Sequence, residues 1–329
     1  MEEYFWGMDL GGTNVVIGLL DSQGQMLVRE SHPTRAELGP GVMVKRVAAV
    51  CAGVREKKRI PPGQIKAMGI GSPGPLCLAE GKIIKAGNLP GFDNFALRAE
   101  LSRLLNIPAV LDNDANAACW GEFWLGAGKD ISDMVLFTLG TGIGGGIVCE
   151  GELVHGSADN GAELGHMIIE LDGRLCNCGQ HGCLEAYASA THTVKRAEES
   201  LKQGADSSLQ KILKEEGRLT CKDVFEHAKE GDKLSLEVVE GTARALAAAC
   251  VNMNHITEPQ RVVLTGGMIH AGDILLELVR QHYAQLMWKL SSSSMEICYA
   301  QLGDSAGVMG AAGLARQAYQ EGNLPPIGT

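Results

Sequence analysis

The strongest constraint on the fold is a pattern that the chain contains twice. Residues 4–28 and residues 134–154 each consist of an apolar stretch, a glycine-rich turn, a second apolar stretch and a short polar turn. The glycine-rich turn runs from Asp9 to Asn14 in the first copy and from Gly140 to Gly146 in the second. Apolar runs joined by such turns predict β-hairpins. Because one unit is used twice, we expect two related lobes that face each other across a cleft, each offering its turn to the same ligand.

Length and charge limit the classes of protein that fit. With 329 residues, the chain exceeds the roughly 250–300 residues of a single hydrophobic core, so two lobes are expected on length alone. No apolar run reaches the roughly 20 residues of a membrane span, and the start, Met-Glu-Glu, lacks the basic region of a signal peptide. We therefore expect a cytoplasmic protein with reduced thiols and no membrane partner. A net charge of −10 argues against nucleic acid as a partner, because phosphate binding needs a basic surface.

The two glycine-rich turns suit a phosphate ligand. Glycine lets backbone N–H groups approach an anion closely, and Thr13, Thr138 and Thr141 add hydroxyl donors. Neither turn is a Walker loop, and neither is a Rossmann fingerprint, because strands rather than helices follow the glycines. Asp9, at the end of the first strand, is a candidate to hold Mg²⁺ through water. Gly266-Gly267 ends another apolar strand and is a third candidate turn, with an ordinary strand-to-helix connection as the alternative.

A polar cluster follows the short apolar strand Ala109-Val-Leu. Its sequence is Asp112-Asn113-Asp114-Ala-Asn116, and an alanine-rich helix comes directly after it. One alternative is that Asn113 or Asp114 only caps this helix. A cap needs one such residue, however, and the carboxyl end of a strand is where an open α/β sheet places its ligand site. The turns Gly71 to Gly74 and Asn88 to Phe92 would each be read as a loop if they stood alone.

Three cysteines and a histidine form a complete ligand set for a tetrahedral zinc ion. The predicted ligands are His166, Cys176, Cys178 and Cys183. Gly179 and Gly182 provide the backbone freedom that a tight ligand loop requires, and Glu163 and Glu185 flank the set. Four protein ligands leave no open position for water, so we expect a structural zinc. A disulfide or inert thiols are the alternatives to metal, and His181 is an alternative to His166 as the fourth ligand.

Apolar stretches outside these motifs are interpreted as core. The remaining cysteines are expected there, because buried free cysteine is common. They are Cys51, Cys77, Cys119, Cys149, Cys221, Cys250 and Cys298. The long alanine-rich helix near Leu234 to Met253 has two interpretations, core or dimer interface.

Taken together, these motifs resemble the ROK family of sugar kinases and repressors, in order from residue 4 to about residue 315, and the resemblance is greatest to its bacterial-type glucokinases. The motifs are Asp9-Leu-Gly-Gly-Thr13-Asn14, Gly71-Ser-Pro-Gly74, Asn113-Asp114, Gly140-Thr-Gly142, Glu163-Leu-Gly-His166, Cys176-x-Cys178-Gly-x-x-Gly-Cys183-x-Glu185 and Leu264-Thr-Gly-Gly267. The resemblance implies an α/β fold of the actin-like (ribonuclease H-like) ATPase class, with mixed sheets in two lobes around a cleft and a structural zinc site. We expect a small lobe of residues 1–115 and 303–329. The large lobe, residues 116–302, would carry the zinc loop and the interface of a homodimer.

The resemblance also implies a role for each matching residue. Asp114 corresponds to the general base. Positions that bind the sugar correspond to Gly74, Asn88, Asn113, Asp114, Glu163, His166 and Glu185. Positions that bind ATP and Mg²⁺ correspond to Asp9, Gly11, Gly12, Thr13, Asn14, Thr138, Gly140, Thr141, Gly142, Gly266 and Gly267. Zinc ligands correspond to His166, Cys176, Cys178 and Cys183.

The activity that the resemblance implies is ATP-dependent phosphorylation of a hexose, glucose to glucose 6-phosphate. One alternative is a kinase for another hexose or for an N-acetylhexosamine. A second is a sugar-sensing regulator without catalysis, which would carry a DNA-binding helix-turn-helix before the kinase-like part. The first strand begins at about Tyr4 and leaves no room for that module, and the chain keeps Asp114.

Overall fold

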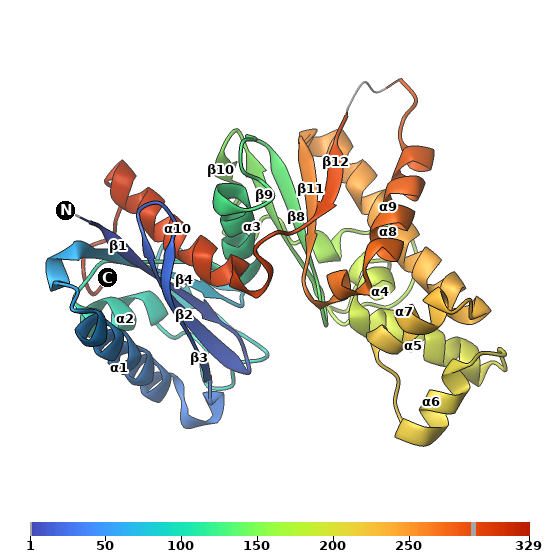
Figure 1. Cartoon of the computed structure of the whole chain (residues 1–329), viewed down its shortest axis with the longest axis horizontal. Helices are drawn as coiled ribbons and strands as arrows, with labels where there is room; N and C mark the ends of the chain where they lie inside the picture. Colours follow the sequence, from blue (N-terminus) through green and yellow to red (C-terminus); the bar gives the residue numbers. More distant parts are fainter. Residues whose placement is uncertain (1, 291–293) are drawn as a thin grey trace. The chain divides into compact units, whose positions relative to one another are not determined.

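The computed structural model describes residues 2–290 and 294–329 and separates into two compact units (Figure 1). Unit 1 comprises residues 1–129, 153–161 and 301–329, and unit 2 comprises residues 130–152 and 162–300. Among the described helices, none is long and apolar enough to cross a membrane.

Unit 1 is built on a five-stranded mixed sheet in the order β3-β2-β1-β4-β7. The strands are β1 (Tyr4–Leu10), β2 (Asn14–Asp21), β3 (Met26–Pro33), β4 (Ile65–Ser72) and β7 (Ala109–Asn113). The first three form antiparallel pairs, and β4 lies parallel to both β1 and β7. A separate small ribbon pairs β5 (Leu76–Cys77) with β6 (Lys82–Ile83). The carboxyl ends of β1, β4 and β7 therefore meet at one edge of the sheet.

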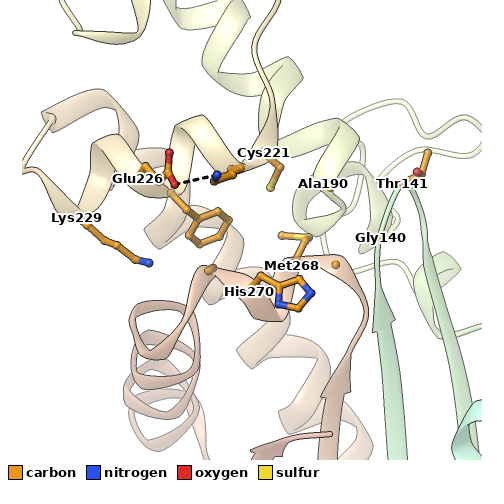
Figure 2. Close-up of a pocket in the computed structure, with 12 residues that line it drawn as sticks. Gly140, Thr141, Ala190, Cys221, Glu226, Lys229, Met268 and His270 are labelled. Carbon is orange, nitrogen blue, oxygen red and sulfur yellow. Dashed lines mark ion pairs between the residues drawn. The ribbon is translucent and has the colours of Figure 1, made fainter. Parts of the chain in front are cut away.

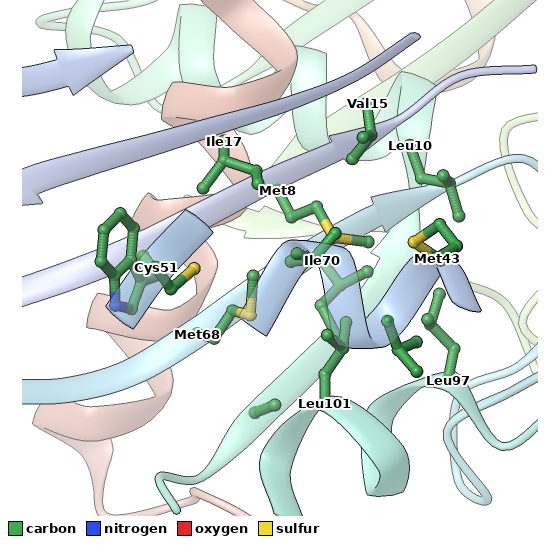
Figure 3. Packing of buried hydrophobic residues seen from close by; sticks show 14 of the residues in the cluster. Met8, Leu10, Val15, Ile17, Met43, Cys51, Met68, Ile70, Leu97 and Leu101 are labelled. Carbon is green, nitrogen blue, oxygen red and sulfur yellow. The ribbon is translucent and has the colours of Figure 1, made fainter. Parts of the chain in front are cut away.

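Helices cover both faces of this sheet (Figure 1). They are α1 (Pro40–Lys58), α2 (Leu97–Leu105), α3 (Asp114–Leu125) and α10 (Ala306–Glu321). Side chains of β1 alternate between the two faces, as the period of a strand requires. Met8 joins a large core with residues of α1 and α2 (Figure 3), and Trp6 belongs to the same core. Phe5 packs instead with Ala312 and Ala315 of α10.

Unit 2 contains a second five-stranded mixed sheet, in the order β10-β9-β8-β11-β12. The strands are β8 (Met134–Leu139), β9 (Ile143–Cys149), β10 (Glu152–Leu153), β11 (Arg261–Thr265) and β12 (Glu296–Tyr299). The pair β8 and β9 is antiparallel, and β11 is parallel to β8 and β12. If the strands of each five-stranded sheet are numbered along the chain, both sheets have the order 3-2-1-4-5. The expected repetition of one folding unit and the expected mixed sheets are confirmed.

The helices of unit 2 lie mainly between β9 and β12 in the chain. They are α4 (Glu185–Ala188), α5 (Ala190–Lys202), α6 (Leu209–Glu216), α7 (Cys221–Lys229), α8 (Lys233–Thr257) and α9 (Asp273–Leu286). Helix α8 is the alanine-rich helix with two interpretations. Val239, Ala243, Leu246 and Cys250 on it are fully buried within the unit, so the core interpretation applies to this face.

The compact units differ from the expected lobes at their boundaries. We expected the first lobe to end at residue 115, but α3 belongs to unit 1. The reason is close packing of α3 against α10: a side-chain carbon on Gly310 would lie 1.6 Å from the carbonyl oxygen of Ala117, so only glycine fits there. Residues 153–161 also belong to unit 1, although no pattern in the sequence predicts this.

The interpretation of the scattered cysteines as core is correct for three of them. Cys51, Cys119 and Cys250 are buried, and burial raises the pKa of the Cys51 and Cys250 thiols to about 12. The expectation is wrong for the other four, which are only partly buried because they lie at the ends of elements or on half-covered faces. They are Cys77, Cys149, Cys221 and Cys298.

Candidate functional site

In unit 1, the predicted site residues gather at the carboxyl ends of β1, β4 and β7. Two glycines adjoin this group of residues. A side-chain carbon on Gly71 would lie 3.6 Å from Cα of Asp114, and one on Gly74 would lie 3.7 Å from the side-chain amide nitrogen of Asn113. Gly74 and Asn113, which the sequence assigned separately to the sugar, are therefore neighbours.

The polar cluster at the end of β7 does cap α3, as its simpler interpretation required. Oδ1 of Asn113 accepts hydrogen bonds from the backbone N–H groups of Ala115, at 2.9 Å, and Asn116, at 3.4 Å. Oδ1 of Asp114 also accepts from Ala115 N–H, at 2.8 Å. One capping residue is enough to start a helix, and Asn113 provides it. The hydrogen bond that orients the Asp114 carboxylate is therefore not needed to cap α3. The Asp114 carboxylate is a candidate for substrate chemistry.

In this group of residues, the negative charge of Asp114 acts on the Asp9 carboxyl. Burial and the negative charge of Asp114 together raise the pKa of the Asp9 carboxyl to about 6, with Arg29 acting in the opposite direction. A side-chain carbon on Gly307, in the first turn of α10, would lie 2.5 Å from Oδ2 of Asp9. Two nearby carboxylates are a suitable environment for a hydrated divalent cation.

The turn from Gly11 to Asn14 is held by a residue that the sequence did not indicate. Thr34 is fully buried, its Oγ1 donates to the Gly11 carbonyl at 2.6 Å, and its N–H donates to the Thr13 carbonyl at 2.8 Å. On the other side, a side-chain carbon on Gly12 would lie 2.8 Å from the Asn88 carbonyl. The predicted phosphate turn and the predicted sugar residue Asn88 thus touch. Thr34 was missed because it follows an edge strand and belongs to no motif.

In unit 2, the predicted zinc ligands converge. One candidate ligand atom from each of His166, Cys176, Cys178 and Cys183 lies within 4.8 Å of the other three. The Cys178 and Cys183 sulfurs are 3.7 Å apart and are not joined by a disulfide. Sulfur ligands of a tetrahedral zinc with bonds of about 2.3 Å lie roughly 3.8 Å apart, so the cluster fits the ion.

The loop conformation agrees with this interpretation. Gly179 and Gly182 have φ of 92° and 81°, as expected of the permissive positions in the loop. His181 is exposed, and its Nδ1 is paired with the Gly173 carbonyl at 2.9 Å. Of the two candidate histidines, the cluster therefore contains His166, whose Nδ1 lies 3.9 Å from the Cys176 sulfur.

Glu185 connects the cysteine cluster to the second glycine-rich turn. The Cys176 thiol is 3.6 Å from Oε1 of Glu185, while Oε2 accepts from Ile143 N–H at 2.9 Å. A side-chain carbon on Gly142 would lie 2.5 Å from the same Oε2, so glycine is required for this contact. The carboxylate is thus fixed from both sides.

The short turn that carries Glu163 and His166 is pressed against the same place. It is a 3₁₀ turn, Leu164–His166, and a side-chain carbon on Gly165 within it would lie only 2.0 Å from the Ile143 carbonyl. Ile143 therefore contacts both the His166 turn and Glu185. Glu163 itself is exposed at the start of the turn, as a residue that binds a ligand would be.

A cavity of about 460 Å³ within unit 2 brings together three of the predicted nucleotide residues, Gly140, Thr141 and Gly267 (Figure 2). Its full lining is Gly140, Thr141, Ala190, Cys221, Lys222, Phe225, Glu226, Lys229, Gly267, Met268, His270 and Ala271. Gly266 adjoins it with φ of 92°, and a side-chain carbon there would lie 2.5 Å from the Leu139 carbonyl. The volume and the mixed apolar and charged lining are typical of a small-molecule site.

Helix α5 fixes the turn at the mouth of this cavity. Ala190 N–H donates to the Gly140 carbonyl at 2.9 Å, and the Thr191 hydroxyl donates to the Thr141 carbonyl at 2.8 Å. The hydroxyl oxygen of Thr138 accepts from Gly144 N–H at 3.0 Å, so this threonine also braces the hairpin.

Helix α7 supplies the part of the cavity that sequence reasoning missed. Cys221, Phe225 and Lys229 all line it, and Cys221 had been interpreted as core (Figure 2). Their spacing of about one helical turn puts them on one face of α7, but such a face normally indicates packing against a core. No pattern in the sequence distinguished a face that lines a cavity from one that packs.

The two mixed sheets and the residues gathered on them define the class of protein, and the chain belongs to the ROK family, whose model matches residues 5–318. Among its relatives, the "Glucokinase" of Thermotoga maritima is 35% identical, over 94% of this chain and 96% of the relative. The "N-acetylmannosamine kinase" of Escherichia coli O9:H4 is 30% identical, over 94% of this chain and 97% of the relative. A ROK family glucokinase from Streptomyces griseus, solved in complex with glucose and AMPPNP, is 30% identical with a TM-score of 0.77, over 96% of this chain and all of that chain.

Proposed function

We propose that this protein is an ATP-dependent hexokinase that converts glucose to glucose 6-phosphate. The observation that carries the proposal is the oriented carboxylate of Asp114 beside the partly buried Asp9 in a member of the ROK family. The glucokinase names of relatives at 30–35% identity support glucose as the substrate.

Asp114 acts as the general base in this proposal. It takes the proton of the sugar's 6-hydroxyl as the oxygen attacks the γ-phosphate. A carboxylate is a weak base for an alcohol, but in a loose transition state the proton leaves late, so a positioned aspartate is sufficient. The Asn113 amide, at the same strand end, hydrogen-bonds a sugar hydroxyl, and Gly74 and Asn88 form the rim of the sugar site.

Glu163, His166 and Glu185 complete the recognition of the sugar. Ionised carboxylates accept hydrogen bonds from hydroxyl groups with charge-assisted strength, which suits a substrate that presents several hydroxyls. The contacts of Glu185 with Ile143 and Cys176 support a fixed orientation of its carboxylate. A pocket that depends on hydroxyl partners discriminates strongly against sugars that lack them.

The other predicted site residues bind ATP and Mg²⁺ in this proposal. The turns Gly11–Asn14 and Thr138–Gly142 cradle phosphates, and the cavity beside Gly266 and Gly267 takes the adenosine. Asp9 would hold Mg²⁺ through water, and the ion would neutralise charge on the transferring phosphoryl group.

We also propose that His166 and the three clustered cysteines hold a structural zinc. A zinc ligand has its ring orientation and tautomer fixed. The zinc would therefore set the aim of a histidine that also touches the sugar.

Asp114→Asn tests the base directly. We expect kcat to fall by roughly 10²–10⁴, the range for loss of a general base, with glucose binding measured by calorimetry largely kept. Asp304→Asn, a change at an exposed carboxylate, is the control. Turnover of Asp114→Asn at the wild-type rate would reject the assignment.

Substrate identity is tested with an ADP-release assay across a panel of hexoses that includes N-acetylmannosamine. The relative named N-acetylmannosamine kinase favours that sugar as the second candidate. We expect the highest kcat/KM with glucose; a higher value with an N-acetylated hexosamine would replace glucose in the proposal, and no phosphorylation of any sugar would favour a sensor.

A homodimer is the proposed assembly. Ile168, Leu171 and Leu175, on the loop around the cysteine cluster, are 50%, 85% and 56% exposed, and their burial in an interface would be favourable. We expect light scattering to give about twice the chain mass of 34.9 kDa at micromolar concentration. A mass equal to one chain across that range would contradict the proposal.

A further inference from the structure

A buried carboxylate stands directly before the proposed sugar residue and the proposed base. Asp112 is 6% exposed, and both of its oxygens are engaged. Oδ1 accepts from the Asn113 N–H at 2.7 Å and from the side-chain amide of Asn116 at 2.9 Å. These contacts fix the backbone of the strand end from which Asn113 and Asp114 project.

The other oxygen of Asp112 is held from a distant part of the chain. Nε2 of His155 lies 2.7 Å from Oδ2 of Asp112. His155 belongs to residues 153–161, the segment that returns to unit 1 and directly precedes the turn with Glu163. The same segment is attached a second time, because Oδ2 of Asp159 accepts from Leu78 N–H at 3.0 Å.

The charges around His155 favour a strong contact. The hydrogen bond to Asp112 raises the pKa of the imidazole, burial opposes this, and the charges of Asp112 and Asp159 add to the rise. Asp112 from β7 and Asp159 from the segment itself are the charged groups that act on the imidazole, and neutral Asn116 comes from α3. The Nε2–H group can donate to Asp112 whether the imidazole is neutral or protonated, so a change of pH does not by itself break the contact.

We propose that His155 is a positioning residue for phosphoryl transfer: it fixes the Asp112 carboxylate, which fixes the amide of Asn113 and so the aim of Asp114. Without a donor at position 155, only the two contacts of Oδ1 hold the carboxylate, so it can tilt and shift the Asn113 backbone with it. A displacement of about 1 Å at a reacting group can cost roughly 10²-fold in rate. The inference rests on Asp114 as the base and on no family motif, because His155 lies outside all the motifs of the sequence.

The test compares two substitutions of similar size that differ in hydrogen bonding. His155→Gln keeps a donor for Asp112, and His155→Met removes it. We expect His155→Met to lower kcat by about 10–100-fold with the KM for ATP changed less than about twofold, and His155→Gln to retain kcat within about fivefold. A substitution that only loosened the fold would affect both variants and both substrates.

His32 on β3 provides the matched control. Its Nε2 is 3.9 Å from a carboxylate oxygen of Glu30, beyond hydrogen-bond distance. His32→Gln and His32→Met are expected to have wild-type kcat. Melting temperatures of all variants are measured, and kinetics are compared well below the lowest of them.

A double-mutant cycle shows whether His155 acts through Asp112. We expect His155→Met combined with Asp112→Asn to be no slower than Asp112→Asn alone, because contacting residues in one network are not additive. The inference fails if His155→Met keeps kcat within twofold, if His155→Gln is as slow as His155→Met, or if the two losses multiply. Asp114→Asn, assayed in parallel, separates the two proposals: wild-type turnover there would reject the base, whatever the His155 variants do.

Discussion

At the scale of single residues, the site in unit 1 keeps a carboxylate that the fold would prefer neutral. Burial and the charge of Asp114 raise the pKa of Asp9 to about 6 from a usual value of 3.8. The folded state therefore binds a proton more tightly than the unfolded state does. The protonated Asp9 carboxyl therefore contributes stability that is fully present below the unfolded-state pKa of 3.8. This stability is lost as the pH rises through the folded-state pKa of about 6. This loss of stability near neutral pH is consistent with a carboxylate that serves to bind a cation rather than to stabilise the fold.

Asp9→Asn is predicted to separate stability from activity. In metal-free protein, the variant should melt at the same temperature as the wild type near pH 4 and at a higher temperature near pH 7.5, because the neutral amide removes the penalty of the buried charge. Its kcat with Mg²⁺ and ATP should fall at least about tenfold.

The measurement is a thermal melt across pH in the presence of a chelator, with a kinetic assay beside it. Glu37→Gln, on an exposed 3₁₀ turn, is the control and should change neither curve. If Asp9→Asn lowered the melting temperature at pH 7.5, the proposed cost of the charge would be wrong.

At the scale of elements, the cysteine loop has little apolar material of its own. Leu171 and Leu175 point to solvent, and the loop bends through positive φ at Gly179 and Gly182. A loop with this composition gains most of its order from cross-links, and four converging ligand atoms would supply them through a metal. The Glu185 carboxylate and the His166 turn are then positioned by the metal as much as by the sheet.

Zinc analysis tests this dependence. We predict about one zinc atom per chain in freshly purified, reduced protein, and its loss in Cys178→Ser, together with an increase of roughly 10–100-fold in the KM for glucose. The KM for ATP should change far less, since Gly140 and Thr141 are also anchored by α5.

Cys149→Ser is the matched control, because this cysteine is partly exposed on β9 and distant in sequence from the cluster. It should keep both the metal and the KM. Wild-type protein without metal, or a Cys178→Ser variant with unchanged affinity for glucose, would remove the zinc from the account of sugar binding.

The sequence predicted these elements unequally, for physical reasons. Turns that need glycine or cysteine, such as those at Gly142 and Cys178, were recognised because few other residues can take their place. Thr34 and α7 were not recognised, because a buried threonine and an amphipathic helix occur throughout folded proteins. Their roles arise only from what tertiary packing puts next to them.

At the scale of the whole molecule, the repetition of the β-hairpin predicted two similar sheets, and both have the same strand order. The boundaries between units were not predictable in the same way. They depend on α3, which a local pattern assigns equally well to either side. Its place in unit 1 is decided by glycine contacts with α10, nearly 190 residues further along the chain.

The chain leaves unit 1 after residue 129, passes through it again at residues 153–161 and returns to it for the last time at residue 301. One buried side chain holds the first and the last of these passages together. Glu122 of α3 is fully buried, and its carboxylate accepts from the N–H groups of Ala127 at 2.9 Å and Leu302 at 2.7 Å. It also accepts from Gln301 N–H, at 3.0 Å. Hydrogen bonds to a charged group contribute about 1.5–3 kcal/mol each, so this carboxylate stabilises both passages of the chain at once.

Glu122→Gln is therefore predicted to lower the free energy of unfolding by about 2–4 kcal/mol, since an amide has one acceptor oxygen and its NH₂ group would face backbone donors. Urea unfolding measures this loss. Glu100→Gln on α2, a partly exposed carboxylate that pairs with Arg103 at the surface, is the control, with an expected change below about 0.5 kcal/mol. Because Asp114 lies on the same helix, kcat should also fall, and addition of saturating glucose should recover part of the stability through binding to the folded state. Unfolding of Glu122→Gln at the wild-type urea concentration would mean that the strands and α10 alone hold these passages in place.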